Sequence, residues 1–273
     1  MLYIPKNCLY LILSLLSALG LCCCNPTGKK TIDEPDSLVV TMADSTMESF
    51  GPDSTTLTFK MILDSIYQHG PKKVFQALMA GHSRFSNDSS FVYHSESKFP
   101  DSLARLRPFL VLTDIDLDQS VEKIFDMRRS MFIQLSSPAC LVDDRQVAAM
   151  EYALHFSGTK VILVLSNSGS RIIGAALDNV QTTNFSSILG ELSQASKAAP
   201  EFADRSSANK VFVNSVAQGQ ARLSLEKILQ MSPQVKMLVD SGKIIMKSAF
   251  YDADTRSVTI LDRVAPLNPS ANR

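Results

Sequence analysis

The stretch PFLVLTDIDLDQSVEKIFD, residues 108–126, decides the fold of this chain. Its apolar run Phe109–Leu112 predicts a buried strand, and three alternating acids follow that strand: Asp114, Asp116 and Asp118. The segment Val121–Asp126 then has the pattern of a short helix. An apolar strand that runs into a row of acids places those acids at the mouth of a site, because ligands of open α/β sheets bind at the carboxyl ends of the strands.

Two further runs on the C-terminal side of this stretch predict strands, Met131–Leu135 and Val161–Leu165, with a helix over Asp143–Phe156 between them. The second run is apolar at every position, which is typical of a strand covered on both faces. This order predicts an α/β fold with a mostly parallel sheet flanked by helices, closed by an antiparallel hairpin. The hairpin strands are Lys243–Tyr251 and Val258–Leu261. The remaining predicted helices cover Leu57–His69, Lys72–Ala80 with Gly81 as C-cap, Ile172–Leu177, Phe185–Lys197, Val211–Gln230 and Pro233–Ser241.

Composition limits the function. The chain has 273 residues, a formal net charge of zero and no long basic run, so nothing in it indicates nucleic-acid binding. Four of its five cysteines lie in the first 24 residues, and Cys140 is alone in the remainder. Neither a disulfide framework nor a cysteine-rich zinc site can be built from that distribution.

The N-terminus has the pattern of an export signal. Leu9–Leu21 is a 13-residue apolar run, about the length of a signal-peptide core and short for a membrane span. It ends in three cysteines that resemble a bacterial lipobox, with Cys24 as the preferred lipid acceptor and Cys22 as a second candidate. A plain cleaved signal and an uncleaved anchor are the alternatives.

These features predict four segments: a lipoprotein signal peptide over 1–23, an acidic flexible tether over 24–56, a globular domain over 57–264 and a disordered tail over 265–273. A lipid on Cys24 would attach the domain to a membrane without spanning it. The expected location is therefore the bacterial cell envelope, on the extracytoplasmic side of a membrane.

Three loops are predicted to meet at the carboxyl edge of the sheet: Thr113–Asp118, Ser136–Cys140 and Ser166–Ser170. Outside them, the four histidines fit ordinary surface or hydrogen-bonded positions, and no Ser-His-Asp spacing is present. Cys140 borders this edge, but a single cysteine is more often a small buried apolar residue than a nucleophile.

From about Lys72 to Asp262 the chain resembles the β-class carbonic anhydrases. VFQALMAGHSRF (74–85) is similar to the family's opening helix and its G-N-x-R-F ending. Residues 108–126 fit the segment P-x-x-V-L-G-C-S-D-S-R-V-x-P-E-x-I-F-D. AAMEYALHFSGTKVILVLSNSGS (148–170) fits S-L-E-Y-A-x-x-x-L-G-x-x-x-I-x-V-L-G-H-x-x-C. The C-terminal helix, S-P, G-K and Y-D elements follow in the same order.

The departures from the family pattern fall on its chemistry. The resemblance places Asp114 and Ser170 at the two zinc-cysteine positions and Asn167 at the zinc-histidine position. Asp116 matches the aspartate of the family's Asp–Arg pair, whereas Asp118 replaces its arginine. The resemblance therefore implies that no residue of the family's metal set survives, and that Asp116 has lost the cation that would orient it.

In this family zinc lowers the pKa of a bound water so that hydroxide attacks carbon dioxide. With these replacements we predict a non-catalytic, carbonic-anhydrase-like lipoprotein that binds no cofactor and has a binding or structural role. Two alternatives remain open. One is an active carbonic anhydrase with non-standard ligands, for which zinc would be the cofactor. The other is a hard-cation or anion binding module built on Asp114, Asp116 and Asp118 with Asn167 and Ser170. The resemblance also implies a homodimer.

Overall fold

The computed structural model describes residues 54–93, 103 and 105–261. The predicted signal peptide, the predicted lipid acceptor Cys24, most of the predicted tether and the predicted C-terminal tail lie outside these residues. Helix α1 (Ser54–Tyr67) begins before the predicted domain boundary at Leu57. Among the described residues, no helix combines the length and the apolar character needed to cross a bilayer.

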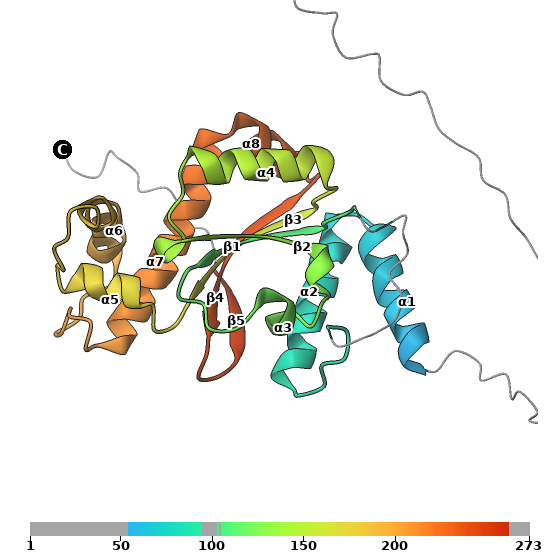
Figure 1. Cartoon of the computed structure of the whole chain (residues 1–273), viewed down its shortest axis with the longest axis horizontal. Helices are drawn as coiled ribbons and strands as arrows, with labels where there is room; N and C mark the ends of the chain where they lie inside the picture. The colour runs from blue at the N-terminus through green and yellow to red at the C-terminus, as the bar shows by residue number, and fades with distance from the viewer. Residues whose placement is uncertain (1–53, 94–102, 104, 262–273) are drawn as a thin grey trace, which may run out of the picture. The chain divides into compact units, whose positions relative to one another are not determined.

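A five-stranded sheet in the order β2-β1-β3-β4-β5 forms the centre of the fold (Figure 1). The strands β1 (Phe109–Asp114), β2 (Phe132–Ser137), β3 (Val161–Asn167) and β4 (Ile245–Asp252) run parallel, and β5 (Ser257–Leu261) pairs with β4 antiparallel. The predicted mostly parallel sheet with a C-terminal antiparallel hairpin is therefore confirmed. In this register Asp114 of β1 lies opposite Ser137 of β2, at the carboxyl ends of both strands.

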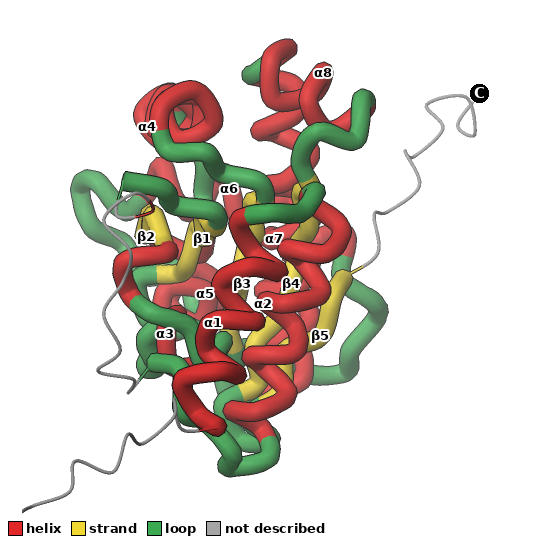
Figure 2. Tube along the Cα trace, turned by 90° about the vertical axis from the view of Figure 1, so that its right-hand side faces the viewer, coloured by secondary structure: helices red, strands yellow, loops and turns green. Residues whose placement is uncertain are grey.

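Successive residues of the central strands enter two separate apolar cores because side chains alternate between the faces of a strand. Leu110 and Leu112 of β1 pack on one face with α4 (Asp144–Phe156) and α7 (Lys210–Met231). Phe109 and Val111 pack on the other face with α1, α2 (Pro71–Ser86) and α3 (Val121–Ile124). Figure 2 shows α1 and α2 lying across this second face. The continuous apolar runs of β1 and β3 thus reflect two covered faces, as predicted.

The remaining elements are short helices and turns. They are the 3-10 turns η2 (Arg129–Met131) and η3 (Pro138–Cys140), and the helices α5 (Arg171–Leu177), α6 (Ser186–Ala198) and α8 (Pro233–Asp240). Asp143 caps α4 through the backbone N–H groups of Arg145 and Gln146, and the Gln146 side chain accepts from the Asp143 N–H in return.

The prediction that Gly81 ends the second helix is wrong, because α2 continues to Ser86. Gly81 lies inside the helix, where an added Cβ would sit 1.9 Å from the carbonyl oxygen of Phe125. Glycine is needed here for the close approach of two backbones, not for a left-handed cap.

Two polar contacts attach the N-terminal helices to the rest of the domain. The ammonium of Lys160, the residue before β3, donates to three carbonyls at and just beyond the end of α1, the shortest contact being 2.8 Å to His69 O. Arg84 of α2 pairs with the fully buried carboxylate of Asp126 at 2.5 Å. That carboxylate also accepts from the Val92 N–H at 2.9 Å, so its charge is compensated inside the core.

Candidate functional site

Asp114 is the centre of the polar cluster at the carboxyl edge of the sheet. Its side chain is buried, with 2% of the residue exposed, and it belongs to β1 itself and not to the loop that the sequence predicted. One carboxylate oxygen accepts from Ser170 Oγ at 2.5 Å, and the other accepts from the Ala139 N–H at 2.9 Å. Asp114 therefore joins β1 to η3 and to the start of α5.

Burial raises the pKa of the Asp114 carboxyl above its usual range, because a low-dielectric surrounding disfavours the charged form. The hydrogen bonds from Ser170 and Ala139 act in the opposite direction, and the nearby charge of Asp116 adds to the rise. The hydrogen-bond donors to both oxygens of the Asp114 carboxyl group thus come from the protein itself.

The turn η3 aims the Ala139 N–H at Asp114. Ala139 and Cys140 both adopt left-handed backbone conformations, with φ of 50° and 57°. Such conformations are costly for residues with a Cβ and persist only where neighbours hold them. Here Ser224 Oγ donates to Cys140 O at 2.7 Å, and Ser137 Oγ donates to Leu141 O at 2.5 Å.

Cys140 is fully buried, and its thiol donates to Leu165 O at 3.3 Å. Burial and the nearby Asp114 raise the pKa of the Cys140 thiol well above its usual range. A thiol with a raised pKa is a poor nucleophile at neutral pH, so Cys140 has the character of a packed apolar side chain, as predicted.

Asp116 faces α5. One of its oxygens accepts from the backbone N–H groups of Arg171 and Ile172, at 2.9 and 3.1 Å. Its other oxygen pairs with the Arg171 guanidinium at 3.0 Å. The expectation that Asp116 has no cation to orient it is therefore wrong, since Arg171, 55 residues along the chain, supplies one.

Asn167 and Asp118 complete the set of predicted positions. Asn167, the last residue of β3, is 3% exposed; its Nδ2 donates to Ser168 O, and no described residue donates to its Oδ1. Asp118 is exposed, and its charge contributes to the raised pKa of Tyr251 after the larger effect of burial. The structure thus brings Asp114 and Ser170 into contact, turns Asp116 toward α5 and leaves Asp118 in solvent.

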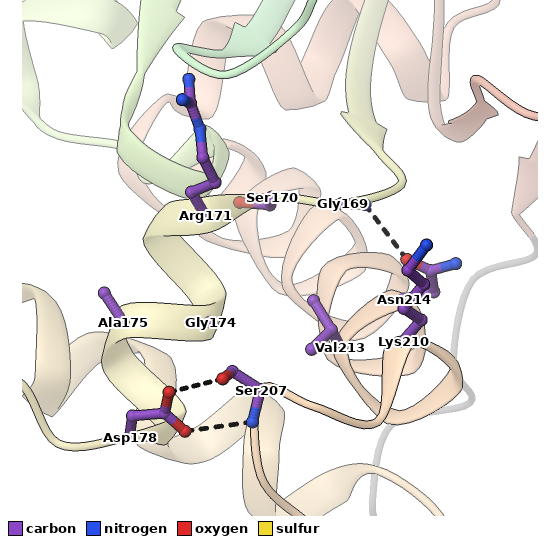
Figure 3. Close-up of a pocket in the computed structure, with 10 residues that line it drawn as sticks. All are labelled: Gly169, Ser170, Arg171, Gly174, Ala175, Asp178, Ser207, Lys210, Val213 and Asn214. Atoms are coloured by element: carbon purple, nitrogen blue, oxygen red, sulfur yellow. Dashed lines mark hydrogen bonds between the residues drawn. The ribbon is translucent and has the colours of Figure 1, made fainter.

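A cavity of about 340 Å³ borders this cluster between α5 and the start of α7 (Figure 3). Asp178 accepts from both the hydroxyl and the N–H of Ser207, and the Gly169 N–H donates to Asn214 Oδ1 at 3.3 Å. In Figure 3 the Arg171 side chain points away from Asn214. Asp178 with Ser207, and the Gly169 N–H with Asn214, are therefore paired within the lining of this cavity, whereas Ser170 and Arg171 pair with Asp114 and Asp116 outside it.

The histidines among the described residues lie away from the cluster. The His82 ring accepts from the Val258 N–H at Nε2, at 2.8 Å, so its Nδ1 carries the proton and donates to Ile124 O at 3.1 Å. Burial lowers the pKa of His82. His155 is exposed on α4. Within the described part of the chain, no group of three or more His, Cys, Asp and Glu side chains is placed to hold a metal ion.

Sequence reasoning missed two members of the cluster. The Ala139 N–H could not be predicted, because every residue except proline has a backbone N–H and the residue type does not show which of them donates to a site. Arg171 could have been found from its place at the first position of a helix whose N-terminal N–H groups need an acceptor. Asp116 provides that acceptor and gains the guanidinium at the same time.

Comparison with known proteins assigns the family. The sequence pattern of the family described as carbonic anhydrase matches residues 111–258, which is more than half of the chain. The chain therefore belongs to the carbonic anhydrase family. No curated protein matches it.

Solved structures share the fold. A β-carbonic anhydrase of the fungus Sordaria macrospora, described as tetrameric, superposes with a TM-score of 0.53 at 18% identity, covering 68% of this chain and 96% of its own. CafA of Aspergillus fumigatus gives 0.54 at 17% identity, with 70% and 92% covered. The Coccomyxa β-carbonic anhydrase in complex with acetazolamide gives 0.50 at 15% identity, with 70% and 82% covered.

Proposed function

We propose that this protein is a carbonic-anhydrase-fold lipoprotein that has lost zinc binding and carbon dioxide hydration and now has a binding or structural role. The observation that carries the proposal is the hydrogen-bonded state of Asp114. Both of its oxygens accept from donors of the protein, Ser170 Oγ at 2.5 Å and the Ala139 N–H at 2.9 Å. A thiolate ligand of the family would instead direct its charge at a metal.

The residues at the three zinc positions do not fit zinc. Asp114 could ligate the ion, but Asn167 and Ser170 offer only neutral oxygen atoms, which are weak donors for this borderline-soft metal. The Ser170 hydroxyl is moreover occupied, since it donates to Asp114 and accepts from the Ile173 N–H at 3.4 Å. Binding zinc here would require breaking the contact that joins β1 to α5.

Metal content and activity test this proposal directly. We expect the full-length protein, purified in detergent, to contain far less than one zinc per chain by mass spectrometry. Stopped-flow hydration of carbon dioxide should not exceed the buffer rate with added Zn²⁺, Mg²⁺ or Ca²⁺. Stoichiometric zinc, or a rate above buffer with any of these ions, would overturn the proposal in favour of an active enzyme or a cation-binding module.

A reverse experiment tests the placement of the residues. The combined variant Asp114→Cys, Asp118→Arg, Asn167→His and Ser170→Cys restores the family's residues at all four positions. We expect this variant to bind zinc, with the wild-type protein as its control. A folded variant that binds none would mean that the alignment of these loops is wrong.

Membrane attachment and assembly are part of the same proposal. The motif that ends in Cys24 supports a lipid anchor, which mass spectrometry of the mature N-terminus would detect. Cys24→Ser should abolish the lipid. If Cys22→Ser alone abolishes it, Cys22 is the lipid acceptor.

The position of β2 at the edge of the sheet supports a homodimer, because an unpaired strand edge is a ready surface for a second copy. Light scattering in solution should give twice the chain mass; a monomer would exclude this assembly.

A further inference from the structure

Charge is distributed unevenly between the two ends of the parallel strands. We call the four residues before each of these strands, 105–108, 128–131, 157–160 and 241–244, the amino edge of the sheet. None of these residues is Asp or Glu, whereas six are basic: Arg105, Arg107, Arg128, Arg129, Lys160 and Lys243. The carboxyl edge has the opposite character, because β1 and β4 end in Asp114 and Asp252 and further acids follow both.

The turn between α1 and α2 adds to this basic edge. Lys160 donates to His69 O at 2.8 Å, so residues 68–73 lie beside the start of β3. The exposed basic residues of the amino edge and this turn are Lys72, Lys73, Arg105, Arg129 and Lys243. None of the ion pairs between described residues involves any of these five side chains, so no described carboxylate neutralises them.

Few acids oppose these charges in the described part of the chain. Asp126, in the segment before β2, is buried and pairs with Arg84. Asp240, at the end of α8, pairs with Lys236. Asp64 is an exposed acid one turn before the end of α1. The amino edge and the turn beside it therefore present an excess of positive charge to solvent.

Two exposed aromatic side chains lie next to the same edge. Phe156 ends α4 and directly precedes residues 157–160, and Tyr152 lies one turn before it. They are 72% and 59% exposed, and their ring centroids are 5.2 Å apart. The Arg107 N–H donates to Ser157 O at 2.7 Å, which holds this end of α4 against the residues before β1. Aromatic rings beside Lys and Arg side chains are typical of protein surfaces that lie at a membrane–water interface.

The predicted N-terminal segment favours a membrane over other anionic partners, and this step rests on the lipid anchor proposed above. Twenty-nine residues separate Cys24 from Ser54, the first residue of α1. A flexible linker of that length has an r.m.s. span of about 30 Å, so a lipid on Cys24 would keep the domain next to the bilayer. At such a distance the effective concentration of the membrane surface is high, and a weak attraction suffices for docking.

We propose that the amino edge docks on the anionic lipid surface of the membrane that holds the anchor. The Lys and Arg side chains would lie at the level of the lipid phosphates, and Phe156 and Tyr152 among the headgroups. Repulsion between the acids of the carboxyl edge and the same surface favours this orientation. Docking in this way turns the carboxyl edge, with Asp114 and its neighbours, toward the aqueous phase.

Quenching of a fluorophore by headgroup-labelled lipid tests this orientation. Cys140 is fully buried, so a cysteine introduced at the surface can be labelled selectively. Gln68→Cys places the fluorophore in the turn between α1 and α2, and Thr255→Cys places it between β4 and β5 at the carboxyl edge. The full-length lipidated protein is inserted into vesicles of phosphatidylcholine alone or mixed with phosphatidylglycerol, with a nitroxide on some of the headgroups. We expect quenching at position 68 to exceed quenching at position 255 in the mixed vesicles, and to weaken in molar salt.

Matched variants identify the contacts. Lys72→Gln with Lys73→Gln should lower the ratio of docked to undocked protein about 25-fold, at about fivefold for each lysine removed. Lys197→Gln with Lys210→Gln removes the same charge from exposed positions on α6 and α7 and should change the ratio less than about twofold. Phe156→Ser should lower the ratio roughly fivefold, and it leaves the core intact because the ring is mostly exposed in the folded domain.

Equal quenching at positions 68 and 255, quenching that does not depend on phosphatidylglycerol, or equal effects of the two lysine pairs would overturn the proposal. Shielding of position 68 that grows with protein concentration in the absence of lipid would assign the edge to a second copy instead. The anchor is judged separately, by the mass of the mature N-terminus. If Cys24 has no lipid, the same quenching measurement with vesicles added to the protein still tests the docking surface.

Discussion

The variant Asp114→Ala tests whether this carboxylate stabilises the carboxyl edge of the sheet by joining β1 to η3 and α5. The change removes the acceptor of two donors, Ser170 Oγ and the Ala139 N–H, and both residues are only 2% exposed. A buried donor left without a partner costs about 1–3 kcal/mol. The buried carboxylate itself carries a desolvation cost, which the variant relieves. We therefore expect Asp114→Ala to lower the free energy of unfolding by about 2–4 kcal/mol.

Asp114→Asn is the matched variant. It keeps the shape of the side chain, its Oδ1 can still accept from the Ala139 N–H, and its Nδ2 can donate to Ser170 Oγ in place of the present bond. No charge is buried, so the loss should stay below about 1.5 kcal/mol. Asp118→Ala, at an exposed position nearby, should change the free energy of unfolding by less than about 0.5 kcal/mol.

Urea unfolding followed by far-ultraviolet circular dichroism measures these values, since the chain has no tryptophan for fluorescence. The measurement is made in EDTA and repeated with zinc. A loss below about 1 kcal/mol in Asp114→Ala, or a loss that appears only when metal is present, would refute the hydrogen-bonded role of this residue.

The pH dependence gives a second check on Asp114. Its pKa is raised in the folded state, so the folded protein holds this proton more tightly than the unfolded chain. Stability from this group is fully present below the unfolded pKa of about 3.9 and is lost as the pH rises through the folded pKa. The stability of the wild type relative to Asp114→Asn should therefore fall across that interval. A difference that is constant with pH would contradict the raised pKa.

Three further perturbations have defined outcomes. Gly81→Ala should lower the free energy of unfolding by about 3 kcal/mol or more, because its Cβ would overlap a backbone carbonyl. Gly190→Ala is the control: there is open space at this position on α6, so the free energy of unfolding should be unchanged or rise by up to about 1 kcal/mol. Thermal unfolding of both variants measures the difference. Arg84→Met leaves the carboxylate of Asp126 buried without its cation and should cost about 3–5 kcal/mol in urea unfolding; a loss under about 1 kcal/mol would contradict the ion pair's role. The lowered pKa of His82 means that its contribution to stability is lost as the pH falls below about 6.5, and His82→Gln should flatten the wild-type decline in that range.

The fold could be predicted from the sequence because its central strands are buried on both faces. Phe109–Leu112 and Val161–Leu165 are apolar throughout, and two-sided burial is the physical reason for that pattern. The C-terminal end of β1 was less predictable, since the apolar run ends at Leu112 but the strand ends at Asp114. The strand continues through Asp114 because this acid finds donors inside the fold, which residue type alone does not reveal.

Gly81 and Arg171 show why the remaining details escaped prediction. A glycine that permits a close backbone approach and a glycine that caps a helix look the same in a sequence, and only the neighbouring Phe125 carbonyl distinguishes them. Arg171 takes a position on α5 from which it reaches Asp116, although the family motif would have its cation two residues after that aspartate, at Asp118. Contacts between residues distant in sequence depend on the packed arrangement and not on local spacing.

If the chain binds no zinc, as proposed above, two contacts at the carboxyl edge of the sheet account for how the fold keeps its geometry. A zinc ion held by residues at positions 114, 167 and 170 would join β1, β3 and the start of α5. In this chain the hydrogen bond from Ser170 to Asp114 joins the start of α5 to β1. Asp116, two residues after Asp114, adds a second connection, because it accepts from the Arg171 N–H and pairs with the Arg171 guanidinium. A few hydrogen bonds supply only a few kcal/mol, far less than a structural zinc site provides. They suffice because the apolar cores on both faces of the sheet carry most of the stability, so the contacts at the edge need only fix the position of α5 relative to β1.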